Sequence, residues 1–302
     1  MIFKSRQEPL ELTILRILNK RMELPENEKS YYLKLKKGYE GEQYFDSLML
    51  ESLKGERLIL NDLLFKFNNT LFQIDSLVIS QHTIHTFELK HHEGDYQFEK
   101  DDFYSSSGKK MNNPIHQLNR SETLFRNMLN NLGCQLPLEP KLVFTHPEFF
   151  LYHAPRDLAI IYHPQLNRSL KKFNSKPSKL NAWHTKLAEK LVAAHIPKSP
   201  YSQIPEFTYE ELKKGITCSS CDSYFVDDEG KKLVCKDCGC EEDIESALLR
   251  SVKEFQVLFP ERKVTTGVVW EWCGMSRSRK AVRRILNKHF KCVGHAQWAY
   301  FE

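Results

Sequence analysis

The chain has 302 residues, of which 41% are hydrophobic and 27% are charged, and this composition excludes a disordered or fibrous protein. The first residues lack the apolar segment of a signal peptide, and no later stretch approaches the roughly 18 uncharged apolar residues of a membrane span. These absences predict a cytoplasmic protein without membrane contacts. The net charge of +5 is unevenly spread, because residues 261–302 hold nine Lys and Arg against three Glu and concentrate the basic surface.

The N-terminal part of the chain predicts two helices and a three-stranded meander. An amphipathic helix is expected over residues 9–22, and a charged segment that contains Pro25 follows it. A second helix is expected from about Gly38 to Gly55, since apolar residues recur there at helical spacing. Three apolar runs come next, and their short connectors predict antiparallel strands over 58–67, 71–80 and 83–90.

The next segment completes an α+β domain. A third helix is expected from Pro114, with Asn113 as its N-cap. Two further strands are expected over 141–145 and 158–162, and the domain closes near His163. This order of helices and strands predicts a mixed sheet that is covered by helices.

Charged residues interrupt two of the apolar strands. Alternation places Glu88 and Lys90 on one face of the third strand, and the meander brings Asp75 beside them. Two converging carboxylates form an oxygen-rich pocket suited to Mg²⁺ or Mn²⁺, and the ammonium can hold an attacking water or the charge that develops on a phosphoryl group. The alternative is that these residues are solvated edge residues. The strongly apolar flanks, such as Val78 and Phe87, favour a site in which the charges have partners.

Two helical residues are candidates for the same pocket. Glu42 shares the apolar stripe of the second helix with Phe45 and Met49, so its carboxylate could add a third ligand. Gln117 shares a face of the third helix with Leu124, where its amide could bond the lysine, a metal-bound water or a phosphate. A helix-capping or core hydrogen bond is an equal alternative for Gln117.

Four motifs together resemble the nuclease-related domain (NERD) family, a branch of the PD-(D/E)XK nuclease superfamily. They are Gly38-x-x-Gly41-Glu42, Gln73-Ile74-Asp75, Glu88-Leu89-Lys90 and Asn113-Pro114-Ile115-His116-Gln117. The resemblance covers roughly residues 35 to 163. It implies a restriction-endonuclease-like core with Gln117 as an accessory residue and with an active-site quartet of Glu42, Asp75, Glu88 and Lys90. The sequence departs from the superfamily's pattern at Ile74, where a proline ordinarily precedes the metal-binding aspartate.

The cysteines predict a structural zinc site. Cys218-x-x-Cys221 and Cys235-x-x-Cys238 are separated by 13 residues that include a turn, which is the plan of two knuckles joined by a hairpin. Four thiolates complete the tetrahedral coordination of Zn²⁺, so the ion would stabilise the fold and take no part in catalysis. Free or redox-active cysteines are the alternative, disfavoured because neither pair lies between a strand and a helix as in thioredoxin. Cys240, two residues beyond Cys238, could be an alternative ligand but is expected to stay free.

The basic C-terminal segment predicts a helix-turn-helix. Helices are expected over 245–258, 267–273 and 277–290, with Ser276 as the N-cap of the last, and residues 294–301 could fold back as a wing. Candidate contacts to nucleic acid are Arg277, Arg279, Lys280, Arg283 and Arg284. A solvated basic helix is the alternative, and helix-turn-helix patterns also mediate protein contacts.

The sequence therefore predicts five segments. They are a helical arm (1–34), the nuclease-like domain (35–163), a linker with one helix (164–215), a zinc ribbon (216–242) and a basic helix-turn-helix or winged-helix unit (243–302). The first hypothesis is an Mg²⁺- or Mn²⁺-dependent nuclease that the C-terminal modules direct to nucleic acid, with DNA favoured over RNA. Double-strand cleavage by a single-site domain favours a homodimer or repeated visits. The alternatives are a non-catalytic nucleic-acid-binding or regulatory protein on a nuclease scaffold and, ranked below it, zinc-mediated protein tethering.

Overall fold

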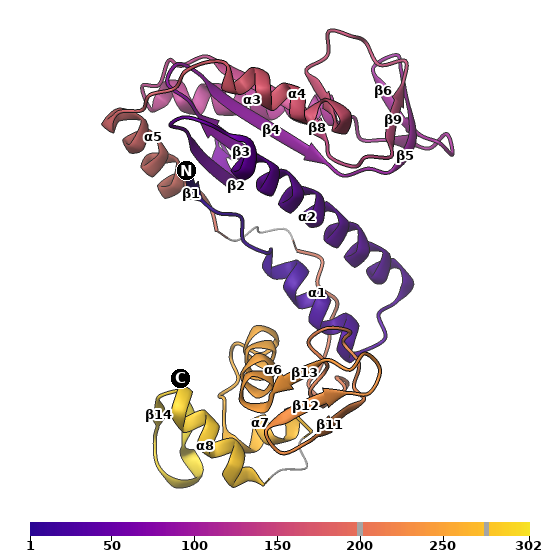
Figure 1. Ribbon diagram of the computed structural model, residues 1–302, viewed down its shortest axis with the longest axis vertical. Coiled ribbons are helices and arrows are strands. Elements are labelled where there is room, and N and C mark those ends of the chain that lie inside the picture. Colours follow the sequence, from indigo (N-terminus) through magenta and orange to yellow (C-terminus); the bar gives the residue numbers. More distant parts are fainter. Residues whose placement is uncertain (198–201, 275–277) are drawn as a thin grey trace. The chain divides into compact units, whose positions relative to one another are not determined.

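The computed structural model describes residues 1–197, 202–274 and 278–302 (Figure 1). Its contacts divide the chain into two compact units, and both are discontinuous in sequence. Unit 1 comprises Met1–Pro9 and Leu33–Ser202, and unit 2 comprises Leu10–Tyr32 and Gln203–Glu302. Most of unit 1 is therefore inserted into the sequence of unit 2.

Unit 1 is built on a mixed sheet in the order β1-β2-β3-β4-β8-β10. Its strands are β1 (Ile2–Lys4), β2 (Leu58–Phe67), β3 (Thr70–Ile79), β4 (Ile84–Lys90), β8 (Leu138–Phe144) and β10 (Ile160–Tyr162). Strands β2, β3 and β4 pair antiparallel, which confirms the predicted meander. Strands β8 and β1 instead run parallel to β4 and β2, and β10 runs parallel to β8. The predicted α+β class is confirmed.

Helices cover both faces of this sheet (Figure 1). The helices of unit 1 are the part of α2 (Glu26–Ser52) that begins at Leu33, together with α3 (Pro114–Asn131), α4 (Leu166–Asn174) and α5 (Ala182–Ala194). One buried cluster joins α3 and α5, through Phe125 and Leu187, to the face that carries Ile84. Another cluster joins α2 and α4 to the opposite face, which carries Phe87 and Leu89. Helices α4 and α5 lie in the stretch that we expected to be a linker, and their buried leucines make them part of unit 1.

Two features of unit 1 differ from the sequence prediction. Helix α2 begins at Glu26, well before Gly38, because Lys, Glu and Leu in this stretch are good helix formers and Pro25 precedes the first turn. A second sheet in the order β7-β6-β5-β9 was not predicted. Its strands are β5 (Gly94–Glu99), β6 (Asp102–Ser105), β7 (Lys110–Met111) and β9 (Phe149–Tyr152), and they close over an aromatic cluster around Phe103 and Phe144.

Unit 2 contains α1 (Leu10–Arg21), a small sheet, three further helices and a C-terminal hairpin within the described residues. The small sheet has the order β11 (Val226–Asp228), β12 (Lys232–Cys235), β13 (Glu241–Asp243). The helices are α6 (Ile244–Leu258), α7 (Thr266–Trp272) and α8 (Arg279–His289), and the hairpin strands are β14 (Cys292–Val293) and β15 (Tyr300–Phe301). All of these helices pack around the buried Trp272 and Phe255. Among the residues described, no helix is sufficiently long and apolar to span a membrane.

The start of α8 differs from the prediction. Its N-cap is Ser278, whose side chain accepts a hydrogen bond from the Ala281 amide, so the helix begins at Arg279. Ser276, which we expected to cap it, and Arg277 lie outside the described residues. Its buried face consists of Val282, Ile285 and Leu286.

Candidate functional site

The site is centred on an interruption of the ladder between β2 and β3. Strand pairing includes Asn61 with Ser76 and Leu63 with Ile74, but the pair Asp62 and Asp75 between them is absent. Asp62 has a φ of 54°, in the left-handed region that an aspartate tolerates. On both strands the alternation of buried and exposed side chains shifts by one residue here. Leu60 and Leu77 therefore pack in the same core as Leu63 and Ile74. Like a β-bulge, this interruption frees a side chain from the regular alternation of the sheet.

The carboxylate of Asp75 takes the place of a backbone pair between β3 and β4. The pairing of these strands ends at Ser76 and Phe87, and beyond it the Asp75 Oδ2 accepts a hydrogen bond of 2.7 Å from the Leu89 amide. This contact holds the aspartate beside the two residues that flank Leu89. Asp75 is only 7% exposed and Glu88 only 3%, so both carboxylates are withdrawn from bulk water.

Lys90 links Glu88 to helix α3. Its Nζ donates to Glu88 Oε1 at 2.8 Å and to Gln117 Oε1 at 3.1 Å. Gln117 lies in the first turn of α3, which is fixed by the Asn113 side chain, because its Oδ1 accepts from the Ile115 amide at 2.9 Å. The structure therefore brings together four of the residues that the sequence singled out.

Glu42 reaches the same region from α2. Its Oε2 accepts a 2.8 Å hydrogen bond from Arg6 Nη1, and the charge of Asp75 acts on its carboxyl group. The neighbouring Gly41 explains part of the glycine motif, because a Cβ at this position would lie 2.4 Å from the His91 Cβ. His91 directly follows Lys90, so only glycine lets α2 approach the end of β4 this closely.

The electrostatics of the cluster favour the binding of a cation. Burial and the charge of Asp75 raise the pKa of Glu42 to about 8, and the same two causes raise the pKa of Glu88 to about 7. Burial also raises the pKa of Asp75. The pKa of Lys90 is lowered by burial, but the carboxylates of Glu88 and Asp75 outweigh this and raise it above its ordinary value. Each carboxylate is thus destabilised as an anion in the absence of further positive charge.

Two residues that the sequence reasoning missed complete the cluster. Arg6 forms a bidentate ion pair with Asp46, at 2.9 and 3.2 Å, in addition to its bond to Glu42. Asp46 lies one helical turn after Glu42 on α2, and this spacing could have identified it. The four carboxylates of Glu42, Asp46, Asp75 and Glu88 face two cations, Arg6 and Lys90. When all four carboxylates are ionised they carry a surplus of two negative charges, and this charge and their oxygen donors are compatible with Mg²⁺ or Mn²⁺.

A comparison with known families assigns this region. Residues 37–145 match the family model of the nuclease-related domain. This chain carries a nuclease-related domain. The match confirms the resemblance found in the sequence and includes Glu42, Asp75, Glu88, Lys90 and Gln117, whereas Arg6 precedes it. No curated protein and no solved structure matches the chain.

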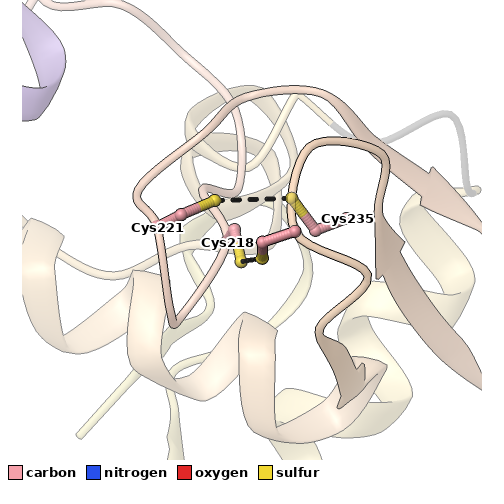
Figure 2. A group of neighbouring side chains, drawn as sticks. Cys218, Cys221 and Cys235 are labelled. Atoms are coloured by element: carbon pink, nitrogen blue, oxygen red, sulfur yellow. Dashed lines mark hydrogen bonds between the residues drawn. The ribbon is translucent and has the colours of Figure 1, made fainter.

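Beyond the nuclease-related domain, unit 2 holds a four-cysteine cluster. The ligand atoms of Cys218, Cys221, Cys235 and Cys238 all lie within 4.8 Å of one another. Figure 2 shows the sulfurs of the labelled cysteines turned toward a common point; two sulfur pairs, Cys218–Cys238 and Cys221–Cys235, are 3.6 and 3.5 Å apart. Tetrahedral Zn²⁺ with Zn–S bonds of about 2.3 Å would hold its sulfurs about 3.8 Å apart. The cluster therefore fits zinc, and Cys240 lies outside it.

The basic residues of α8 line a groove in unit 2. Arg279, Lys280 and Arg283 border a groove of about 530 Å³ together with Thr265 and Ala296. The guanidinium of Arg279 lies 4.9 Å from the ring centre of Trp270, while Lys280, Arg283 and Arg284 are exposed. Four of the five predicted nucleic-acid contacts thus lie on one short helix, and the fifth, Arg277, is outside the described residues.

Proposed function

We propose that this chain is a metal-dependent nuclease that hydrolyses phosphodiester bonds, with DNA as the favoured substrate. The observation that carries the proposal is the convergence of Asp75, Glu88 and Lys90 beside the ladder interruption of a nuclease-related domain. Two buried carboxylates next to a charged lysine are costly to maintain unless the charges are used. Hydrolysis of a phosphodiester uses all three.

Each residue of the site would have a different role in the reaction. Asp75 and Glu88 would hold Mg²⁺ or Mn²⁺, an ion that supplies Lewis acidity and lowers the pKa of a water molecule. The Lys90 ammonium would orient the attacking water or stabilise charge on the phosphoryl oxygens. Glu42 would assist from α2, and Gln117 would keep Lys90 in place through its 3.1 Å hydrogen bond.

Unit 2 would direct the enzyme to its substrate. Helices α6, α7 and α8 followed by a hairpin, together with the bridge between Val264 and Phe301, follow the order of a winged helix. Arg279, Lys280, Arg283 and Arg284 would contact phosphates and groove edges, which favours duplex DNA over RNA because the deep groove of RNA excludes a helix. A linked binding module raises the local concentration of substrate. Cleavage of both strands would then require a homodimer or repeated visits.

The test is a cleavage assay with a matched mutant. Purified chain is incubated with linear, circular and single-stranded DNA and with RNA, in the presence of Mg²⁺ or Mn²⁺, beside Glu88→Ala and the exposed control Glu99→Ala. Cleavage by the wild type and by Glu99→Ala, but not by Glu88→Ala, supports the proposal and identifies the substrate. Nucleic-acid binding without cleavage under every condition would overturn it and favour a non-catalytic binding protein on a nuclease scaffold.

A further inference from the structure

The N-terminal segment Met1–Pro9 lies outside the matched residues 37–145, yet it contacts the centre of the site. It enters unit 1 through β1, which pairs in parallel with β2 next to the strand that carries Asp75. We propose that Arg6 is a positioning residue for the candidate nuclease reaction, and that the segment around it is an integral part of the site. This inference rests on the function proposed above.

Arg6 connects three elements at one point. Its guanidinium donates to Glu42 Oε2 at 2.8 Å and to both carboxylate oxygens of Asp46. Arg6 therefore binds two successive turns of α2. It also donates to the backbone carbonyl of Asp75 at 2.7 Å. Asp75 is the β3 residue that has no partner on β2 in the strand pairing. Arg6 therefore links the interrupted part of β3 to helix α2.

The hydrogen bonds of Arg6 exclude a direct role on the substrate. A guanidinium has five N–H groups, and four of those in Arg6 donate to Glu42, Asp46 and Asp75. The side chain is only 4% exposed. A substrate phosphate could therefore reach it only by displacing these bonds. Arg6 acts through Glu42 and Asp75, whose orientation it determines.

Lys4 supports the opposite side of the same interruption. Its Nζ donates to the carbonyls of Asn61 and Asp62 at 2.8 and 2.7 Å. Lys4 and Arg6 therefore supply side-chain partners to backbone groups on both strands where the regular pairing fails. Unsatisfied buried carbonyls would be costly there. The N-terminal segment thus stabilises the backbone conformation that directs the Asp75 side chain toward Glu88 and Lys90.

Positioning predicts a loss in turnover rather than in substrate binding. The test compares Arg6→Gln and Arg6→Lys with wild type and with Arg57→Gln, a matched control that also removes a buried guanidinium of unit 1. Arg57 donates to the carbonyls of Phe173 and Lys176. Arg6→Gln is expected to lower kcat by about 100-fold, the loss that follows a displacement of about 1 Å in a catalytic group, with KM and the melting temperature close to those of the control. Arg6→Lys should recover little, since one ammonium cannot reproduce a planar fork that serves three acceptors.

Two results would overturn the proposal. One is a kcat of Arg6→Gln that equals wild type; the other is a kcat that falls no further than that of Arg57→Gln, which would make Arg6 merely structural. If the wild type cleaves nothing, Mn²⁺ binding measured by calorimetry on the full chain still tests the inference. Arg6→Gln should then weaken Mn²⁺ binding about tenfold or more relative to Arg57→Gln, and an unchanged or tighter Kd would refute the role of Arg6. Failure of the nuclease and failure of the positioning role are thus separated.

Discussion

The cysteine cluster and the carboxylate cluster of this protein are assembled over very different lengths of chain. The four cysteines of unit 2 lie within residues 218–238, in two pairs with the same CxxC spacing that a hairpin joins. The carboxylate cluster of unit 1 draws its residues from α2, β3 and β4 and is completed by Arg6, from before the first helix. The first cluster is local and repetitive, whereas the second depends on the whole topology of its unit.

The difference also separates stability from chemistry. Zinc held by four thiolates has no open coordination position, so the cysteine cluster would stabilise the fold and would not catalyse. In the carboxylate cluster the pKa values of Glu42 and Glu88 are raised, and Lys90 links Glu88 to helix α3. Each of the following predictions tests either unit 2 or the carboxylate cluster of unit 1 and its surroundings.

The largest effect is expected from loss of a zinc ligand. Cys235→Ser removes a thiolate that is only 2% exposed, at a kind of site worth about 10 kcal/mol of folding free energy in isolated zinc modules. The variant should lose its zinc and its hydrogen-exchange protection around residues 218–243, while unit 1 stays protected. The exposed Cys292→Ser is the control and should keep one zinc per chain. Full zinc content in Cys235→Ser would refute the assignment of this ligand.

The next effect concerns the lysine of the carboxylate cluster. Lys90→Ala removes the group that bonds Glu88 and Gln117, and we expect cleavage to fall by about 100-fold or more, the range seen when a charge-stabilising donor is lost. Zinc content should not change, because the lysine belongs to the other unit. The exposed Lys100→Ala serves as the control in the same assay. Equal cleavage rates for the two variants would remove Lys90 from the mechanism.

Charge reversal on α8 tests the targeting role of unit 2. Arg279→Glu with Arg283→Glu should weaken DNA binding by at least about tenfold and make its salt dependence shallower by about two counterions. The reference is Lys288→Glu, since Lys288 already pairs with Glu245 at 2.6 Å and should matter less for DNA. Binding titrations over a range of salt concentrations measure both quantities. Affinity and slope that match the wild type would count against this helix as the binding surface.

The last prediction concerns the packing of α2 beside the site. Gly41→Ala forces a Cβ against His91, whose Nδ1 is held by Thr145 at 2.8 Å, and should lower the free energy of unfolding by about 1–3 kcal/mol. Gly38→Ala is the matched control on the same helix, since nothing lies within 4 Å of its added Cβ. Higher helix propensity should make that variant more stable by about 0.5–1 kcal/mol. Chemical denaturation measures the free energy of unfolding of both variants. If the two substitutions change it in the same direction, the close approach of Gly41 to His91 is contradicted.

Strong local patterns allowed much of the fold to be predicted. The first strand of the meander was expected over 58–67 and is found at Leu58–Phe67, because long apolar runs with short connectors leave few alternatives. The second sheet was missed, since its strands are short and β7 has only two residues. The early start of α2 was missed because we gave more weight to Pro25 and the charged segment than to helix propensity.

The candidate site was only partly visible in the sequence for a related reason. Glu88 and Lys90 are two residues apart, so alternation alone places them together. The ladder interruption at Asp62 and Asp75 depends on tertiary contacts and leaves no local signal. Arg6 is separated from Asp75 by 69 residues, and a single arginine near the start of a chain resembles many surface arginines. Long-range partners of this kind require the topology of the sheet.

The discontinuity of unit 2 has a consequence for biosynthesis. Helix α1 is synthesised before the inserted residues of unit 1, and its partners in α6 follow more than 200 residues later, as in the buried pair of Arg21 with Glu254. Its apolar face, with Ile17 and Leu18, must remain uncovered while the inserted residues 33–202 are made and fold. Domains generally fold as units during translation, so unit 1 can fold before the partners of α1 have been made. The part that would select the nucleic acid is then completed only after the part that would cut it.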